Sequence, residues 1–226
     1  SRRSLYFPFS LGHFANDFVP CSVVVLAPAI ALEMGLNPME VGLLLTLHSL
    51  GSALGYFPSG LMADSVRNRG NLLMLTFWWV GLGYLLASFA PGFWSLALLF
   101  ALAGCGDAAW HPLATAILVQ ADPQNRGQAL GLHAIGGTLS AVIGPVIVGF
   151  LLVSMDWRET LHWIILPTLL VGILFLKIRK WVPEQPGRKA ISKDDFKHLW
   201  KSWTKKTGLL IICLMSSYHM SLVAMM

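Results

Sequence analysis

Two aspartates, each four residues from a histidine, lie within otherwise apolar stretches of the 226-residue sequence. His13 precedes Asp17, and Asp107 precedes His111. Residues four apart share one face of an α-helix, so each pair forms a unit. An apolar environment favours the neutral form of a carboxylate, whereas a neighbouring imidazolium favours the charged form, so such a pair can exchange a proton near neutral pH. We therefore predict that Asp17 and Asp107 bind protons or cations, with His13 and His111 as their partners.

Other roles for these residues stay open. Two satisfied Asp–His pairs can simply fix the packing of helices. His48 and His133 also lie in apolar stretches and are candidates for the same cavity, although a hydrogen-bonded packing role is more typical of such histidines. Cysteine, methionine and histidine together suit soft metals such as copper, and one helix face carries His13, Asp17 and Cys21. The sequence has no dense ligand motif, so we predict no metal site and no cofactor.

The segments that must position these residues are too apolar for an ordinary soluble protein. Hydrophobic residues make up 55% of the sequence and charged residues 12%, against about 25% charged in soluble domains. The mean hydropathy is +0.64. Most of the chain consists of apolar blocks of about 20 residues, each long enough to cross a bilayer. This composition excludes a disordered chain and predicts an all-α, polytopic membrane protein. The sequence shows no phosphate loop or nucleophile triad, so we predict that the protein is not an enzyme.

Glycine, proline and charged residues divide the chain into seven predicted membrane spans. The spans are residues 5–33, 39–63, 71–90, 93–119, 127–154, 160–181 and 208–226. If the N-terminus is cytoplasmic, every lysine and arginine except Arg158 lies on the cytoplasmic side, as the positive-inside rule requires. The first and fourth spans then run in opposite directions, and Asp17 and Asp107 both lie roughly 18 Å from the cytoplasmic end, near the midplane.

Three regions follow from this division. Residues 1–181 form a six-helix bundle, residues 182–207 form a basic linker, and residues 208–226 form a seventh helix that begins a second bundle. Within the linker, Phe196, Trp200 and Trp203 follow helical spacing with lysines on another face, which predicts an amphipathic helix on the cytoplasmic leaflet. Because much of the net charge of +5 lies in this linker, it does not indicate a nucleic-acid partner.

Several motifs resemble those of the major facilitator superfamily. Gly60, Asp64 and Arg69 match part of the signature of its 2–3 loop, and Gly144, Pro145 and Gly149 resemble its fifth helix. The segments Leu11–Asp17 and Trp110–Pro112 resemble the subgroup of fosmidomycin-resistance-type exporters. In the fourth span many antiporters of the family carry an arginine four residues before a glycine, and if that glycine is Gly104, Phe100 occupies the arginine position. A mechanism that depends on that arginine therefore cannot be transferred.

The resemblance implies a bundle of two inverted three-helix repeats, with the first and fourth helices facing a central cavity. It further implies alternating access, with proton-coupled export of a small anionic or amphipathic solute across a bacterial inner membrane. Gly60, Asp64 and Arg69 would form a conformational latch, and Gly144, Pro145 and Gly149 would allow close packing and bending. The partners would be the solute, protons, lipid and either a second half or a partner membrane subunit. A half-transporter acting as a structural subunit of a membrane complex is the alternative.

Overall fold

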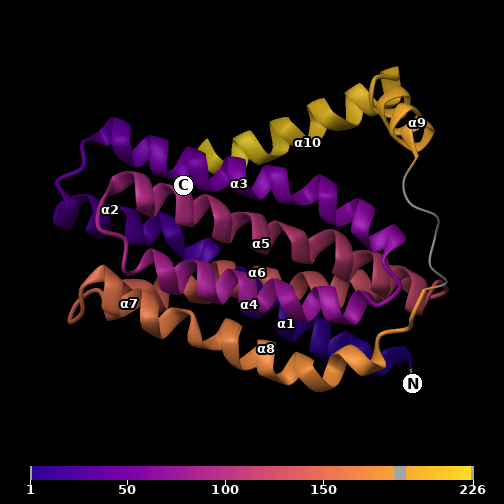
Figure 1. Cartoon of the computed structure of the whole chain (residues 1–226), viewed down its shortest axis with the longest axis horizontal. Helices are drawn as coiled ribbons and strands as arrows, with labels where there is room; N and C mark the ends of the chain where they lie inside the picture. Colours follow the sequence, from indigo (N-terminus) through magenta and orange to yellow (C-terminus); the bar gives the residue numbers. More distant parts are fainter. Residues whose placement is uncertain (1, 186–191, 225–226) are drawn as a thin grey trace. The chain divides into compact units, whose positions relative to one another are not determined.

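The computed structural model describes residues 2–185 and 192–224 and divides the chain into two units, residues 1–188 and 189–226 (Figure 1). Each unit is described by itself. Throughout the described residues the regular elements are helices, which confirms the predicted all-α fold. The α-helices of the first unit are α1 (Tyr6–Asp17), α2 (Val23–Met34), α3 (Pro38–Ser65), α4 (Arg69–Ala87), α5 (Phe93–Ala121), α6 (Arg126–Leu151), α7 (Trp157–Ile164) and α8 (Leu166–Ile178).

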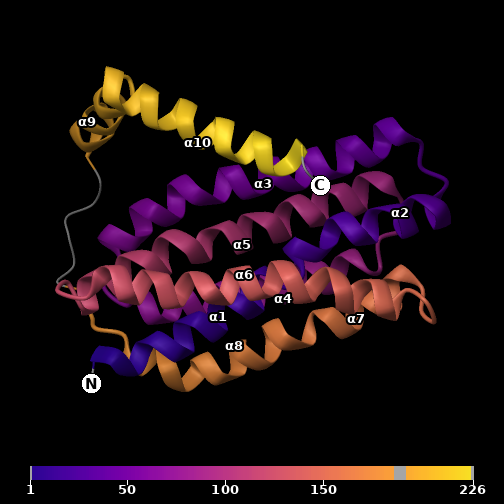
Figure 2. The same cartoon turned by 180° about the vertical axis from the view of Figure 1, so that it is seen from behind.

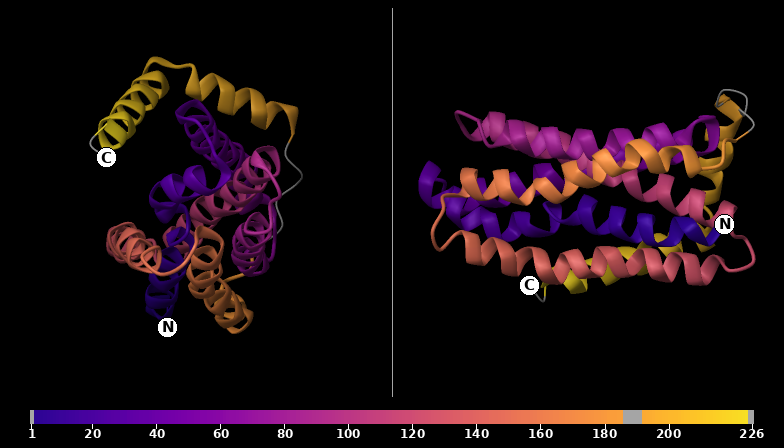
Figure 3. Two further views of the ribbon diagram at one scale, coloured as in Figure 1. Left: turned by 90° about the vertical axis from the view of Figure 1, so that its left-hand side faces the viewer. Right: turned by 90° about the horizontal axis from the view of Figure 1, so that it is seen from below.

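Six segments of the first unit are long and apolar enough to cross a membrane. They are Tyr6–Met34, Pro38–Ser65, Arg69–Ala87, Phe93–Ala121, Arg126–Leu151 and Trp157–Trp181. Their helices run roughly parallel to one another, with α4 on the face seen in Figure 1 and α6 on the face seen in Figure 2. The left panel of Figure 3 shows the same helices almost end-on. The chain begins at one end of the bundle, where α3 also ends and α4 begins. We call this end the N-terminal end.

The first and sixth spans each contain an interruption that the hydropathy pattern did not indicate. The 3₁₀ turn Pro20–Ser22 separates α1 from α2. Pro20 has no N–H, so it cannot continue the ladder of hydrogen bonds that α1 began. In the sixth span Pro167 lies in the first turn of α8, directly after α7 ends. The first interruption matters for function because it places Asp17 at the last residue of α1.

Local sequence explains where other helices begin and end. Asn37 accepts a hydrogen bond from the backbone N–H of Glu40, and Glu40 accepts one in return, so α3 begins with a capping box. Gly35, with φ of 65°, ends α2 in the left-handed conformation that favours glycine. Asp156 caps α7 through the backbone N–H of Glu159.

Two helix pairs pack closely through small residues, α1 with α6 and α3 with α5. A Cβ on Gly136 of α6 would collide with the carbonyl oxygen of Ser10 of α1, and a Cβ on Gly51 of α3 would collide with the backbone of Ala101 of α5. In an inverted repeat the first span corresponds to the fourth and the fifth to the second, so these two pairs are counterparts. Small residues allow such close approach between membrane helices.

The second unit contains α9 (Lys193–Trp203) and α10 (Lys206–Ala224). The predicted amphipathic linker helix corresponds to α9, whose Phe196, Trp200 and Trp203 side chains are exposed within the unit. A helix is present where the seventh span is predicted, but α10 is not among the six segments that qualify as spans within the described residues. A seventh membrane crossing therefore stays a prediction, and residues 225 and 226 of that span lie outside the described residues.

Candidate functional site

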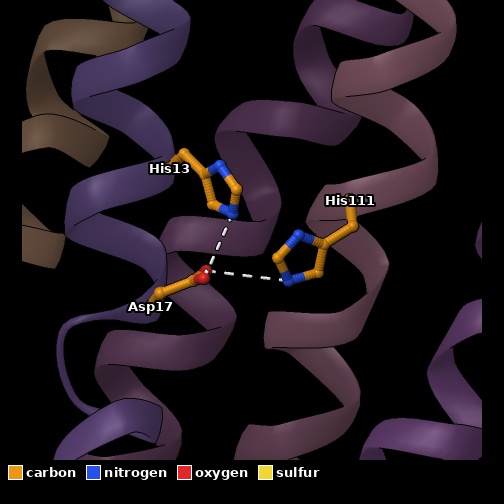
Figure 4. Close-up of side chains that lie close together, drawn as sticks. All are labelled: His13, Asp17 and His111. Atoms are coloured by element: carbon orange, nitrogen blue, oxygen red, sulfur yellow. Dashed lines mark ion pairs between the residues drawn. The ribbon is translucent and has the colours of Figure 1, made fainter. Parts of the chain in front are cut away.

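The structure brings the four predicted residues His13, Asp17, Asp107 and His111 together in one cluster between α1 and α5. His13 and Asp17 come from α1 and His111 from α5, and both imidazoles point toward the carboxylate of Asp17 (Figure 4). We call the four residues, with Asn16, the midplane cluster. Its four titratable side chains retain between 13% and 22% of their exposure, so the cluster is neither sealed nor open.

The contacts of His13 determine which of its ring nitrogens carries a hydrogen. Its Nδ1 lies 2.8 Å from the carbonyl oxygen of His133. A carbonyl oxygen only accepts, so Nδ1 carries the hydrogen of this bond. The other nitrogen, Nε2, lies 3.1 Å from Oδ2 of Asp17. A neutral His13 would therefore present a lone pair to a carboxylate oxygen, and this contact is favourable only with a proton or another cation between the two atoms.

Asn16 joins the two carboxylates, a role that the sequence did not reveal. Its side-chain Nδ2 donates to Oδ1 of Asp107 over 2.5 Å and lies 3.2 Å from Oδ1 of Asp17 and from the backbone oxygen of Asp107. The residue is fully buried. Its amide oxygen is buried and has no hydrogen-bond partner among the described residues. Asn16 thus donates both of its side-chain N–H groups to acceptors of Asp17 and Asp107. Hydrogen-bond acceptors still outnumber hydrogen-bond donors in the cluster.

His111 faces both carboxylates without a hydrogen bond to either. Its Nε2 lies 3.6 Å from Oδ1 of Asp17 and 4.0 Å from Oδ1 of Asp107. The ring stacks on Tyr56 at a centroid distance of 5.8 Å and meets the ring of His13 edge-on at 5.1 Å. His111 is the most exposed member of the four, so it is the one best placed to meet a molecule that enters the site.

The two other predicted histidines occupy different positions. His133, on α6, stacks on His13 at a centroid distance of 4.2 Å, and its Nδ1 bonds to the carbonyl oxygen of Phe9. His133 therefore packs against the cluster and fixes the His13 ring. His48, on α3, lies 2.6 Å from the hydroxyl of Tyr84 through its Nε2. Its ring also packs against Phe100. His48 is therefore hydrogen-bonded and partly buried within the bundle, an arrangement that agrees with the packing role given above as the alternative.

The predicted latch residues lie at the N-terminal end of the bundle. Gly60 and Asp64 line a cavity of about 360 Å³ between α3 and α5. Arg69 is 2% exposed and donates to Gln120 over 2.7 Å and to the carbonyl oxygen of Pro183 over 3.4 Å. No ion pair joins Asp64 to Arg69 within the described part of the chain. In this conformation Arg69 thus holds the end of α5 and the segment after α8.

The three predicted packing and bending residues lie in α6. A Cβ on Gly144 would meet the Ser22 hydroxyl and the backbone of Phe18, so this glycine allows α6 to approach the interrupted first span. Pro145 lies inside α6, which continues to Leu151. Gly149 has no described heavy atom near its virtual Cβ, so no close packing explains it here.

Three ligand atoms of the midplane cluster could hold a metal ion. The imidazole nitrogens of His13 and His111 and a carboxylate oxygen of Asp17 all lie within 4.8 Å of one another. These donors are nitrogen and oxygen, whereas the copper-like alternative rested on sulfur. The Cys21 thiol instead accepts a hydrogen bond from Ser140 over 3.9 Å. The predicted seventh span adds Met215, His219 and Met220 as possible soft-metal ligands, and their side chains lie outside the described residues.

Comparison with known protein families identifies the fold. The family model of the major facilitator superfamily matches residues 9–226. The chain belongs to this superfamily. Its members are membrane transporters of small molecules, so the predictions of family and of a protein that is not an enzyme are confirmed.

Several named transporters match the chain. A probable 4-methylmuconolactone transporter of Cupriavidus pinatubonensis is 31% identical over 67% of this chain and 36% of its own length. A probable sugar efflux transporter of Helicobacter acinonychis is 28% identical over 94% of this chain and 54% of its own length. The fosmidomycin resistance protein of Escherichia coli is 24% identical over 78% of this chain and 43% of its own length. The chain thus spans between about a third and a half of these relatives.

Solved structures show the same arrangement of helices. The peptide transporter POT, in complex with alafosfalin, aligns with a TM-score of 0.73 at 15% identity over 94% of this chain and 46% of that chain. A bacterial homologue of the lysosomal transporter Spinster, inward-facing and unoccupied, aligns with a TM-score of 0.66 at 22% identity over 85% of this chain and 45% of that chain. At these identities the comparison supports the superfamily fold.

Proposed function

We propose that this superfamily member exports a small solute from the bacterial cytoplasm in exchange for protons, by alternating access. The superfamily supplies the transport class, and the efflux direction has its support in relatives named as sugar efflux transporters and as a fosmidomycin resistance protein. We place the N-terminus in the cytoplasm, which the distribution of lysine and arginine supports. We place the protein in the bacterial inner membrane, which the bacterial relatives support.

The excess of hydrogen-bond acceptors in the midplane cluster carries the proposal of proton coupling. Asp17 and Asp107 come from the two helices that an inverted repeat makes counterparts, and one asparagine amide joins them. With His13 committed to the carbonyl of His133, the contact between His13 and Asp17 needs a proton. Burial of two facing carboxylates without a compensating positive charge is costly. The cluster therefore binds a proton and releases it when the cavity opens to the other side.

His111 connects the proton to the solute in this proposal. It faces both carboxylates from 3.6 Å and 4.0 Å and is the more exposed imidazole. A protonated His111 adds a positive charge at the edge of the cluster, which attracts an anionic group of the solute. The solute class that follows is a small anionic or amphipathic molecule, and its departure allows the proton to move back to the carboxylates.

The remaining predicted residues act on the conformational change. Gly60 and Asp64 line the cavity at the N-terminal end, where a helix of the second half can pack, and Arg69 holds that end through Gln120. Loss of one backbone hydrogen bond at Pro145 makes α6 easier to bend next to Gly144. α3 and α6 are the least buried of the six spans, so they offer the faces on which a second bundle would complete the cavity.

The test measures proton movement driven by a candidate solute. Full-length protein is reconstituted into vesicles that contain a pH-sensitive dye and a chelator, and fosmidomycin is supplied on one side. We expect the solute to move protons in the opposite direction, and Asp107→Asn to abolish proton movement while solute binding persists. Proton coupling that is unchanged in Asp17→Asn and in Asp107→Asn would contradict the proposal. His162→Gln is the control, because His162 bonds to Ser88 away from the cluster.

A further inference from the structure

We propose that His13, Asp17 and His111 form a binding site for a divalent transition-metal ion of the zinc type. Their ligand atoms lie within 4.8 Å of one another although they come from two helices. Both imidazoles point at the same carboxylate (Figure 4). Two histidines and one carboxylate around a common point, with further positions open, form a donor set that transition metals bind.

The spacing of the donor atoms agrees with tetrahedral coordination. Metal–ligand bonds of about 2.0–2.2 Å at a tetrahedral angle place neighbouring donors roughly 3.3 Å apart. The His13 nitrogen lies 3.1 Å from Oδ2 of Asp17, and the His111 nitrogen lies 3.6 Å from Oδ1 of the same carboxylate. The pair on α1 therefore already has the required spacing. The His111 nitrogen lies within 4.8 Å of both other ligand atoms, and its ring is partly exposed, so it can approach an ion held by the α1 pair.

The surroundings of His13 provide an independent argument. Metal-binding histidines usually donate their second ring N–H to a carbonyl or carboxylate, which orients the ring and leaves the other nitrogen free to coordinate. His13 does so through Nδ1, which bonds to the carbonyl oxygen of His133 over 2.8 Å. The ring of His133 stacks on it almost in parallel, at 20°. A ring held in this way presents Nε2 to Asp17 at little further cost in entropy.

The charge of the cluster also favours a divalent cation. Asp107 lies 4.0 Å from His111 and adds a second carboxylate beside the three ligands. A divalent ion compensates both carboxylates at once. The donors are nitrogen and oxygen, which favours ions such as Zn²⁺ and Co²⁺ over copper(I), which prefers sulfur. Side-chain exposures of 14% to 22% leave a route by which the ion can enter.

The metal would occupy the place at which the proposed function requires a proton. Metal binding itself does not depend on transport, so the two proposals can fail separately. If both hold, the ion and the proton are alternatives at one site, and a bound ion stops transport by keeping the cluster occupied.

The experiment measures direct binding of Co²⁺, whose visible absorption reports its coordination. Full-length protein is purified with a tag free of histidine, stripped with a chelator, dialysed and titrated with CoCl₂. We expect one site with the absorption bands of four-coordinate Co²⁺, which Zn²⁺ displaces. His13→Gln and His111→Gln should each weaken binding at least about tenfold, because each removes a ligand. His162→Gln, which alters a histidine bonded to Ser88 instead, should leave binding unchanged.

Three results would overturn the inference: no saturable Co²⁺ binding by the wild type, unchanged affinity in His111→Gln, or equal loss in His162→Gln. His111 is the more exposed ligand, so its variant keeps the test valid if His13→Gln does not fold. Metal binding with unaltered proton coupling in the presence of chelator would support both proposals. Metal binding without any proton coupling would contradict only the proposed function.

Discussion

His13 and His48 are both hydrogen-bonded histidines of the membrane-spanning helices, and they differ in what surrounds them. His48 has one partner, the Tyr84 hydroxyl at 2.6 Å, and aromatic packing from Phe100. His13 has a carbonyl on one ring nitrogen and a carboxylate on the other, with a second carboxylate nearby on Asp107. The imidazole of His48 and the hydroxyl of Tyr84 form a hydrogen bond in which neither group needs to be charged. Around His13 the acceptors outnumber the donors.

In the proposed function, this difference separates a packing histidine, His48, from a functional one, His13. Both residues lie in apolar spans and both are largely buried, so burial alone does not distinguish them. The number of acceptors that lack a donor distinguishes the two histidines, because each such acceptor requires a proton, a cation or a ligand. The predictions that follow test whether this difference has the consequences we assign to it.

The largest expected effect comes from removing the charge of the cluster. Asp17→Asn should lower proton-coupled transport by about 100-fold or more, as expected for a positioned group that transfers a proton. His48→Gln should leave the transport rate within about threefold of wild type, because no step is assigned to it. Both variants are compared in vesicles with an imposed pH gradient and a chelator. Equal losses in the two variants would remove the distinction between the sites.

The close packing of α3 against α5 supports both histidine sites and is sensitive to added volume. Gly51→Leu places a side chain against the backbone of Ala101 and should destabilise the protein by about 3 kcal/mol. Gly149→Ala, at a position with no described atom near its virtual Cβ, should be neutral or stabilising by about 1 kcal/mol. Thermal unfolding in detergent measures both. Similar melting temperatures for the two variants would show that the helices separate at little cost.

Removing the bridge between the carboxylates should have an intermediate effect. Asn16→Leu deletes the N–H donors to Asp17 and Asp107, and a lost hydrogen bond to a charged group costs about 1.5–3 kcal/mol. We expect the transport rate to fall about tenfold, in line with that cost. Asn125→Leu removes a similar bond to Asp122 at the N-terminal end and is the matched control. If the two variants transport equally well, the bridge has no special role.

The smallest effect is expected at the core histidine. Tyr84→Phe leaves Nε2 of His48 without its partner and should cost about 1 kcal/mol of stability, with no change in proton coupling. Melting temperature and proton movement are measured on the same preparation. A loss of coupling would place His48 in the transport mechanism and contradict the comparison.

Much of the site could be predicted because helix geometry is regular. A rise of 1.5 Å per residue places Asp17 and Asp107 at one depth, and a spacing of four residues places each histidine beside its aspartate. The six spans could also be predicted from the sequence, because each is an apolar block of sufficient length. Residue spacing along each helix therefore sufficed for the height of the cluster and for the pairs within one helix.

The contacts between helices could not be predicted in the same way, because depth does not specify rotation about the helix axis. Nothing in the spacing distinguishes Asn16, which joins two helices, from an asparagine that faces lipid. The interruption at Pro20 shifts the end of α1 to Asp17, although other prolines, such as Pro112, lie inside continuous helices. The hydrogen bond of Arg69 to Gln120 was not predicted either, because it depends on how α4 and α5 pack, and the latch formed with Asp64 stays a prediction.

The central claim is that the midplane cluster holds an exchangeable proton, and infrared difference spectroscopy tests it without knowledge of the solute. Spectra of full-length protein in chelator are recorded at low and high pH. The account predicts a carboxyl band that changes between the two conditions, is lost in Asp17→Asn or in Asp107→Asn, and persists in His48→Gln. A band that survives in both aspartate variants, or a wild type without such a band, would contradict it.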